Sequence, residues 1–336
     1  MYNETRGLVN STVRVLMTME WLNQHFDEVD NFPRPNWESI YSHVENHLKD
    51  ADQHELWCEI ARTWMIRLKS ALPTEYAIHE SENFILVASV SDKYVSVFQN
   101  YLERTLKKIL KTLQGVASDD GFGKYVVLIF NDIDTYYSYL SYFYSDDGVY
   151  GLSTGVYLNK GYGHFALPHQ DASYAESIAA HEMTHALVAH LPIPAWLNEG
   201  MAVNIENMFT GSAPLKMDDE LYARHREFWG ESEIQEFWSG DSFNRPDEGQ
   251  ELSYHLAQFA VTSLSKDYEA FIEFTNKAHF SDGGEAAASE VYGGSLGNLI
   301  AQFFGEGVWA PNPESWVEAH SNNAAQTDAA KLRGWP

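Results

Sequence analysis

Two prolines, Pro192 and Pro194, divide one helical stretch of this sequence into two, and this break constrains the fold more than any other feature. Proline does not continue a helix, but it suits the first turn of a new one. We therefore expect a helix before the break and a second helix after it, running to about Phe209 with Gly211 as its stop. The link Leu191–Ile193 is short enough for the second helix to fold back antiparallel beside the first.

The first of these helices carries two histidines four positions apart, His181 and His185. Ser173 and Glu176 form a Ser-x-x-Glu capping box, which predicts that the helix starts near Tyr174. Positions four apart lie on the same helix face, so the two imidazoles can bind one Zn²⁺ ion. A catalytic zinc site needs three protein ligands and an open position, which leaves one ligand to be found.

Two glutamates complete the predicted site. Glu182 lies about 100° around the helix from His181, beside the metal, where it can accept a proton from zinc-bound water. Glu199 in the second helix is the expected third ligand, because the proline break brings it back towards the histidines. Glu206 lies two turns, roughly 10 Å, further along that helix and is better placed as outer support. His190 faces away from His181 on the first helix. The prediction is one zinc per chain.

The residues now described resemble a known family. His-Glu-x-x-His followed by Trp196-Leu197-Asn198-Glu199-Gly200-Met201-Ala202 is similar to the gluzincin metallopeptidases, and within them to the peptidase MA-like domains. The resemblance runs from about Phe84 to about Phe304 and is strongest in residues 174–206. It implies a zincin-like fold, with Glu199 as third zinc ligand. It also implies peptide-bond hydrolysis with Glu182 as general base. The Gly-x-Met-x-Asn strand of aminopeptidases is absent, which favours an endopeptidase.

Two further roles follow from the resemblance. Thermolysin-like enzymes place an acid four positions after the third ligand to orient a zinc-binding histidine, but here that position holds Val203. Asn204 and Glu206 are the candidates for this supporting role. The resemblance also points to Tyr254, at the start of a later helix, as a hydrogen-bond donor to the oxyanion, with His255 as a weaker alternative.

The charge of the chain limits its partners. It carries 48 acidic and 22 basic residues, a net charge of −26, which argues against nucleic acid and anionic membrane as partners. We expect a peptide or protein substrate, and the oligomeric state stays open. The single cysteine, Cys58, excludes an internal disulfide. The segment Met1–Arg6 has no signal pattern, and no apolar run is long enough to cross a membrane, so a cytoplasmic protein is expected.

The expected fold is α+β, with a small mixed β-sheet packed on the zinc-site helices. We expect a helical N-terminal region at 1–80, a zincin-like half at 81–210, and a helical half at 211–336 that completes the cleft. Buried strands are predicted at Phe84–Val90 and Tyr125–Phe130. The resemblance implies that the strand Gly163–Leu167, directly before the zinc helix, is an edge that binds extended substrate.

Two other functions compete with peptide hydrolysis. The chain could be a non-catalytic, zinc-containing binding protein with a peptidase-like fold, or a metal hydrolase that acts on something other than peptides. The presence of Glu182 argues against the first alternative, because a purely structural metal site has no use for a base.

Overall fold

The computed structural model describes residues 21–47, 50–144, 154–211 and 217–316, and it shows an α+β protein that is mostly helical. The chain forms two compact units. The described part of the first comprises the residues up to Arg104 together with Asp119–Ala175, and that of the second comprises Thr105–Ser118 and the residues from Glu176 onward. These boundaries differ from the three-part division expected from the sequence.

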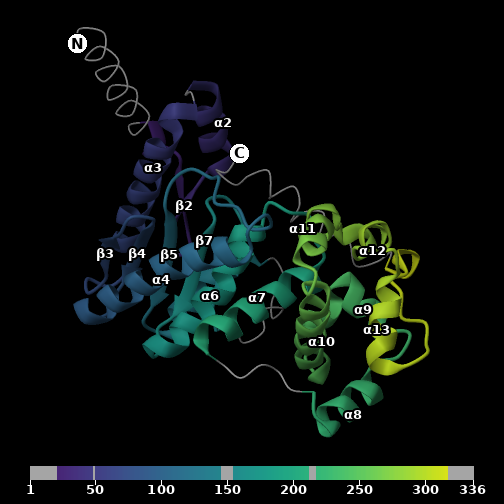
Figure 1. Ribbon diagram of the computed structural model, residues 1–336. Helices are drawn as coiled ribbons and strands as arrows, with labels where there is room; N and C mark the ends of the chain where they lie inside the picture. Colours follow the sequence, from purple (N-terminus) through teal and green to yellow (C-terminus); the bar gives the residue numbers. More distant parts are fainter. Residues whose placement is uncertain (1–20, 48–49, 145–153, 212–216, 317–336) are drawn as a thin grey trace. The chain divides into compact units, whose positions relative to one another are not determined.

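A mixed five-stranded sheet organises the first unit, in the order β3-β4-β5-β7-β6 (Figure 1). The strands are β3 (Ala77–Glu80), β4 (Phe84–Ala88), β5 (Tyr125–Phe130), β6 (Val156–Leu158) and β7 (His164–Pro168). The three central strands β4, β5 and β7 are parallel, and β3 and β6 pair antiparallel at the two edges. All residues of β4 and β5 are buried, as expected for parallel strands covered on both faces. The two strands predicted here are confirmed.

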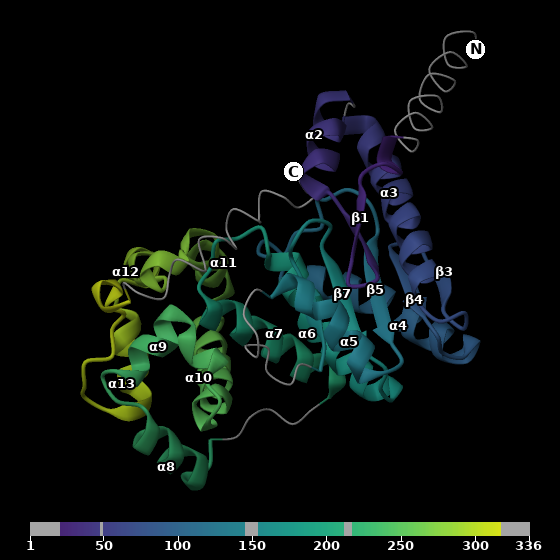
Figure 2. The ribbon, with the colours of Figure 1, turned by 180° about the vertical axis from the view of Figure 1, so that it is seen from behind.

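Helices cover both faces of this sheet. Figures 1 and 2 show α4 (Asp92–Thr112), which connects β4 to β5, on one face and α5 (Ile133–Leu140) on the other. The helix α3 (Asp50–Ala71) packs beside β3 and β4 and brings Trp57 and Trp64 into the core. Alternate residues of β5 enter the same core, which follows from the two-residue period of a strand.

The expectation that residues 1–80 are helical is only partly right. The helices α2 (Trp37–His47) and α3 are present, but β1 (Phe26–Val29) and β2 (Phe32–Pro35) form a hairpin, and β3 joins the main sheet. Asp30 and Asn31 make the two-residue turn, with φ angles of 52° and 64°. Positive φ at both turn positions suits the twist of a hairpin, and Asp and Asn tolerate it. The sequence predicts a break at residues 31–35, but only Asn31 of that segment belongs to the turn, and the other four residues form β2.

The predicted edge strand is also corrected. The strand β7, which directly precedes the metal-site helix in sequence, pairs with β5 on one side and with β6 on the other. Its backbone groups are therefore already hydrogen bonded within the sheet. The edge on this side is β6 instead.

The second unit is a bundle of helices. They are α6 (Ala172–Val188, whose first turn belongs to the other unit), α7 (Ala195–Thr210), α8 (Asp219–Phe228), α9 (Glu233–Ser239), α10 (Glu248–Leu264), α11 (Tyr268–Lys277), α12 (Glu285–Tyr292) and α13 (Leu296–Phe304). The sequence predicts a polar loop from Gly230 to Gln250, but α9 lies within this segment. A closing helix predicted at Trp316–Leu332 lies almost entirely outside the described residues.

One glycine lets the backbones of α7 and α10 approach closely. A Cβ atom on Gly200 of α7 would lie 2.5 Å from the carbonyl oxygen of Ala257 on α10. The amide of Asn204 donates hydrogen bonds to the carbonyl oxygens of Gly200 and Gln258, and thereby joins the two helices at the same place. Because a missing side chain lets two backbones approach, α7 and α10 are held together along this line.

No helix in the described part of the chain combines the length and apolar character needed to cross a membrane.

Candidate metal site

The helix α6 begins one residue before the predicted capping serine. The backbone N–H groups of Tyr174 and Ala175 donate to the carbonyl oxygen of Asp171, and the helix starts at Ala172. Ser173 therefore lies inside the first turn, and the predicted capping box is wrong. The existence of the helix and its end before Pro192 are as predicted.

The helix α7 begins directly after Pro194, which is the extended residue before the first turn. Gly211 ends it in the left-handed conformation with φ of 69°, as the sequence indicated. The two helices are thus separated by the proline-containing link that the sequence predicted. This arrangement returns α7 towards the middle of α6, where the two histidines lie.

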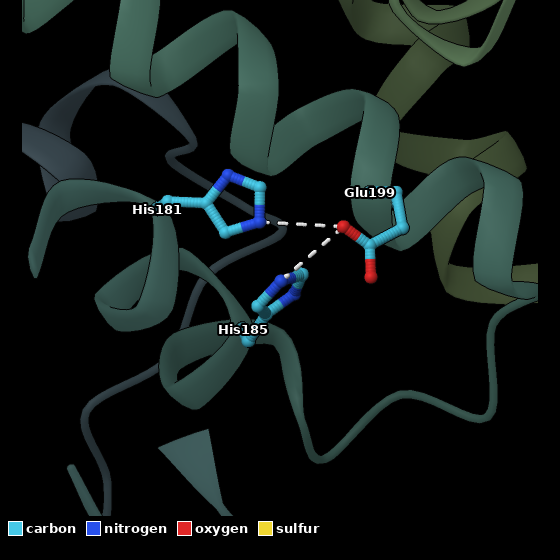
Figure 3. A group of neighbouring side chains, drawn as sticks. All are labelled: His181, His185 and Glu199. Atoms are coloured by element: carbon cyan, nitrogen blue, oxygen red, sulfur yellow. Dashed lines mark ion pairs between the residues drawn. The ribbon is translucent and has the colours of Figure 1, made fainter. Parts of the chain in front are cut away.

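Three side chains from these helices converge on one point. His181 and His185 of α6 and Glu199 of α7 each offer one ligand atom, and these atoms lie within 4.8 Å of one another. The Oε2 atom of Glu199 is 3.3 Å from Nε2 of His181 and 3.5 Å from Nε2 of His185. Figure 3 shows both imidazole rings directed at the carboxylate. This partly buried group could hold a metal ion, as predicted for these three residues.

The opposite nitrogen of each ring is already engaged. Nδ1 of His181 lies 3.1 Å from Oε2 of Glu206, and Nδ1 of His185 lies 2.8 Å from Oδ1 of Asn198. A carboxylate and an amide oxygen only accept hydrogen bonds, so each Nδ1 carries the proton. The neutral form of each ring then presents a lone pair at Nε2, towards Glu199. Ligand histidines in metal sites are held in this way.

The atoms that face one another favour a cation between them. Oε2 of Glu199 is buried and has no hydrogen-bond partner, although two histidine nitrogens are near it. Two nitrogen lone pairs and a carboxylate oxygen this close together repel one another unless a proton or a metal ion lies between them. A metal ion at their centre would replace the proton and bind all three groups, so the donor set fits a metal such as zinc.

The pKa values of these groups describe the same strong coupling. Burial alone would lower the pKa of His181, but Glu199 and Glu206 outweigh it and raise that pKa to about 10. Burial would raise the pKa of Glu199, but His185 and His181 outweigh it and hold that pKa well below its usual value. The carboxylate is therefore ionised, as a metal ligand must be.

Two further predicted residues lie near this group. The negative charge of Glu182 contributes to raising the pKa of both His181 and His185. The pKa of Tyr254 is raised by burial and then by Glu199 and Glu182, which places its hydroxyl in the field of the same carboxylates. Tyr254 is on α10, the helix joined to α7 at Gly200.

The supporting residue is Glu206 rather than Asn204. Glu206 also accepts a hydrogen bond from the hydroxyl of Ser177, 2.5 Å away, so it bridges α7 to α6. Asn204 bonds to backbone carbonyls instead. Sequence reasoning missed Ser177, and it did not assign a role to Asn198. The position of Asn198 directly before the third ligand was a usable signal, because the antiparallel helices bring that turn beside His185.

The two weaker alternatives lie elsewhere. His190 is exposed and follows the end of α6, outside the convergent group. The ring of His255 lies 6.0 Å from that of His225 on α8, centroid to centroid, and its strongest charged influence is Glu251. Tyr254 is thus the better placed of the two predicted oxyanion donors.

Comparison with known proteins gives no family for this chain. No protein-family model matches it, and a search of curated proteins found no match. The function therefore has to be inferred from the residues of the site.

Proposed function

We propose that this protein is a zinc-dependent metallopeptidase, and more specifically an endopeptidase of the gluzincin type with a zincin-like fold. The observation that carries the proposal is the convergence of two imidazole nitrogens and one buried, unpartnered carboxylate oxygen. Glu182 lies beside this group without belonging to it. A base next to a three-ligand site is the arrangement that hydrolysis requires and that a purely structural site does not use.

The chemistry of the ligands supports zinc as the metal. Two histidines and one glutamate with a position left open is a ligand set of catalytic zinc. Zinc would supply Lewis acidity, which polarises a substrate carbonyl and makes water a stronger acid.

The protein side chains would then perform the following roles. Glu182 removes a proton from the attacking water and delivers it to the leaving amine. Tyr254 donates a hydrogen bond to the oxygen that becomes negative in the tetrahedral intermediate. The pKa of its hydroxyl is raised, so the proton is present at neutral pH. Glu206 and Asn198 hold the two ligand rings in the orientation that leaves Nε2 free.

Metal analysis tests the ligand set. Purified protein should contain one zinc per chain, and His181→Ala should lose most of it. Glu199→Ala should weaken zinc affinity more than Glu206→Ala, because Glu199 contacts the metal and Glu206 acts through His181. Full zinc retention in the histidine variants, or the reverse order of the two glutamate variants, would overturn the assignment.

Turnover of a mixed peptide library tests the reaction. Glu182→Gln keeps the shape of the side chain and removes the base, so zinc should stay bound while turnover falls by a factor on the order of 10² or more. A zinc-loaded protein that cleaves no peptide would favour the binding-protein alternative. Ester and non-peptide amide substrates in the same assay would reveal a different hydrolase.

A further inference from the structure

The helix α8 buries an ionisable side chain where a helix of its kind normally buries an apolar one. Among the residues Asp219–Phe228 only His225 is fully buried, with no exposed surface. Helices are usually attached through leucine, isoleucine or similar residues on one face. The contacts that attach α8 therefore include a buried residue whose charge can change with pH.

The tautomer of His225 is fixed by the residue that follows the helix. The indole N–H of the buried Trp229 donates to Nδ1 of His225 at 2.9 Å. Because an indole only donates, Nδ1 must carry a lone pair and the neutral ring must carry its proton on Nε2. That Nε2 atom is buried and has no hydrogen-bond partner in the structure.

A second imidazole supplies the complementary atom. His255 of α10 has its ring centroid 6.0 Å from that of His225, and its Nδ1 atom is also buried without a partner. Its Nε2 atom faces Glu251, 3.9 Å from Oε1, which favours the proton on Nε2 and a lone pair on Nδ1. One unpartnered donor and one unpartnered acceptor thus lie on neighbouring rings.

We propose that the buried, neutral ring of His225, fixed by Trp229 and beside the ring of His255, holds α8 on α10, and that acid releases α8 by protonating the two histidines. This arrangement requires both rings to be neutral. A proton on Nδ1 of His225 would displace the bond from Trp229, and protonation of both rings would place two positive charges side by side in a buried position.

The surrounding charges favour the neutral rings at pH 7. Arg224 of α8 binds both oxygens of Glu251 at 3.2 and 2.8 Å and approaches Glu248 at 3.3 Å, so the acid nearest to His255 is already paired. The ring of Phe304, at the end of α13, stacks on His225, and α13 carries no charged or titratable side chain. Arg226, the remaining cation of α8, bonds to the carbonyl oxygen of Phe304.

The pKa values agree with this geometry. Burial, then His255 and Arg224, lower the pKa of His225 to about 4. Burial also lowers the pKa of His255, against the opposing effect of Glu251. A histidine with pKa of about 4 when docked and about 6.5 when released weakens docking about 30-fold at pH 5 relative to pH 8.

The same atoms exclude a second metal site here. A metal ligand must offer a lone pair. In His225 the lone pair of the neutral ring is used by Trp229, and the other nitrogen holds the proton.

Amide hydrogen exchange across pH 5 to 8, corrected for intrinsic rates, tests the release. Protection of the α8 amides should fall about 30-fold towards pH 5, while α12, which contains no histidine, provides the internal reference. His225→Phe keeps a buried ring against Phe304 and removes the titration, so protection of α8 should lose most of its pH dependence. His255→Asn places a non-titrating acceptor where Nδ1 lies, and it should reduce the dependence.

Nitrogen NMR of the histidine rings tests the neutral tautomers in the wild-type protein, and the two variants serve only to assign the signals. At pH 7.5 both rings should be neutral with the proton on Nε2. A proton on Nδ1 of His225, or protection of α8 that changes no more than that of α12, would overturn the proposal.

Discussion

The carboxylate of Glu206 accepts a hydrogen bond from Nδ1 of His181 at 3.1 Å, although it lies seven residues beyond the third ligand on α7. Ser177 fixes the other oxygen of the same carboxylate. The acid expected four positions after the ligand is therefore replaced by one about two turns along, which reaches the first histidine of the pair.

This relationship gives a prediction for metal affinity. Glu206→Gln should weaken zinc binding by about 10- to 100-fold, because the ring of His181 loses its charged acceptor and part of its orientation. Competition with a chromophoric chelator measures the affinity. Glu176→Gln, on α6, is the matched control and should bind zinc like the wild type. Equal affinities for the two variants would contradict the positioning role.

Metal removal should destabilise the fold of the second unit. A ligand that binds only the folded protein stabilises it by about 2.7 kcal/mol at a concentration 100 times its Kd. Thermal unfolding with zinc should therefore occur at higher temperature than with a chelator present. Glu199→Ala should remove most of this difference. A difference that persists unchanged in that variant would show that zinc binds elsewhere.

His164 should make stability depend on pH in the first unit. It is fully buried on β7, where Tyr139 donates to its Nε2 and its Nδ1 bonds to the carbonyl oxygen of Tyr162, and burial lowers its pKa to about 3. The imidazole takes up a proton at about pH 6.5 in the unfolded chain but only at a much lower pH in the folded chain. The contribution of His164 to the free energy of unfolding is therefore fully present above pH 6.5 and is lost as the pH falls.

Urea unfolding of the wild type and His164→Gln measures this contribution. The difference in unfolding free energy between the two should shrink by about 2 kcal/mol from pH 7.5 to pH 5, because glutamine does not titrate. A difference that stays constant with pH would mean that the folded ring takes up a proton as readily as the unfolded one.

Gly200 should not tolerate even one added methyl group. In Gly200→Ala the new Cβ would meet the carbonyl oxygen of Ala257 at 2.5 Å and Cγ2 of Val261 at 2.6 Å. We expect a loss of about 1–3 kcal/mol in unfolding free energy, as for other overpacked contacts. Gly294→Ala is the control, since only Asn298 lies near its Cβ, at 3.6 Å. Equal stability of the two variants would show that α7 and α10 can separate without cost.

The convergence of two histidines and a glutamate could be predicted because it depends on local rules. His181 and His185 follow from the helical repeat, and Glu199 follows from a proline break that returns the chain. The buried strand Tyr125–Phe130 was likewise readable as an apolar, β-branched run. These features need only neighbours in sequence.

The features that were missed depend on distant partners. Residues 31–35 were interpreted as a break because their two prolines are unusual in a strand and the sequence does not show that β1 pairs with β2. The strand β7 looked like an edge because β6 pairs with it from a stretch of weak strand signal. The role of Ser177 depends on Glu206 arriving from another helix. The secondary-structure propensity of single residues does not predict such pairings, because tertiary contacts determine them.

The close approach at Gly200 also predicts which residue relatives of this chain should carry at this position. The atom that a larger residue would strike is a backbone oxygen of Ala257, and no exchange of side chains in α10 can remove it. Proteins often accept a larger residue on one helix when a smaller one replaces its neighbour on the other helix, but no such compensating substitution is available at this position. In distant relatives that share this packing, the glycine directly after Glu199 should persist even where the surrounding segment no longer resembles this one.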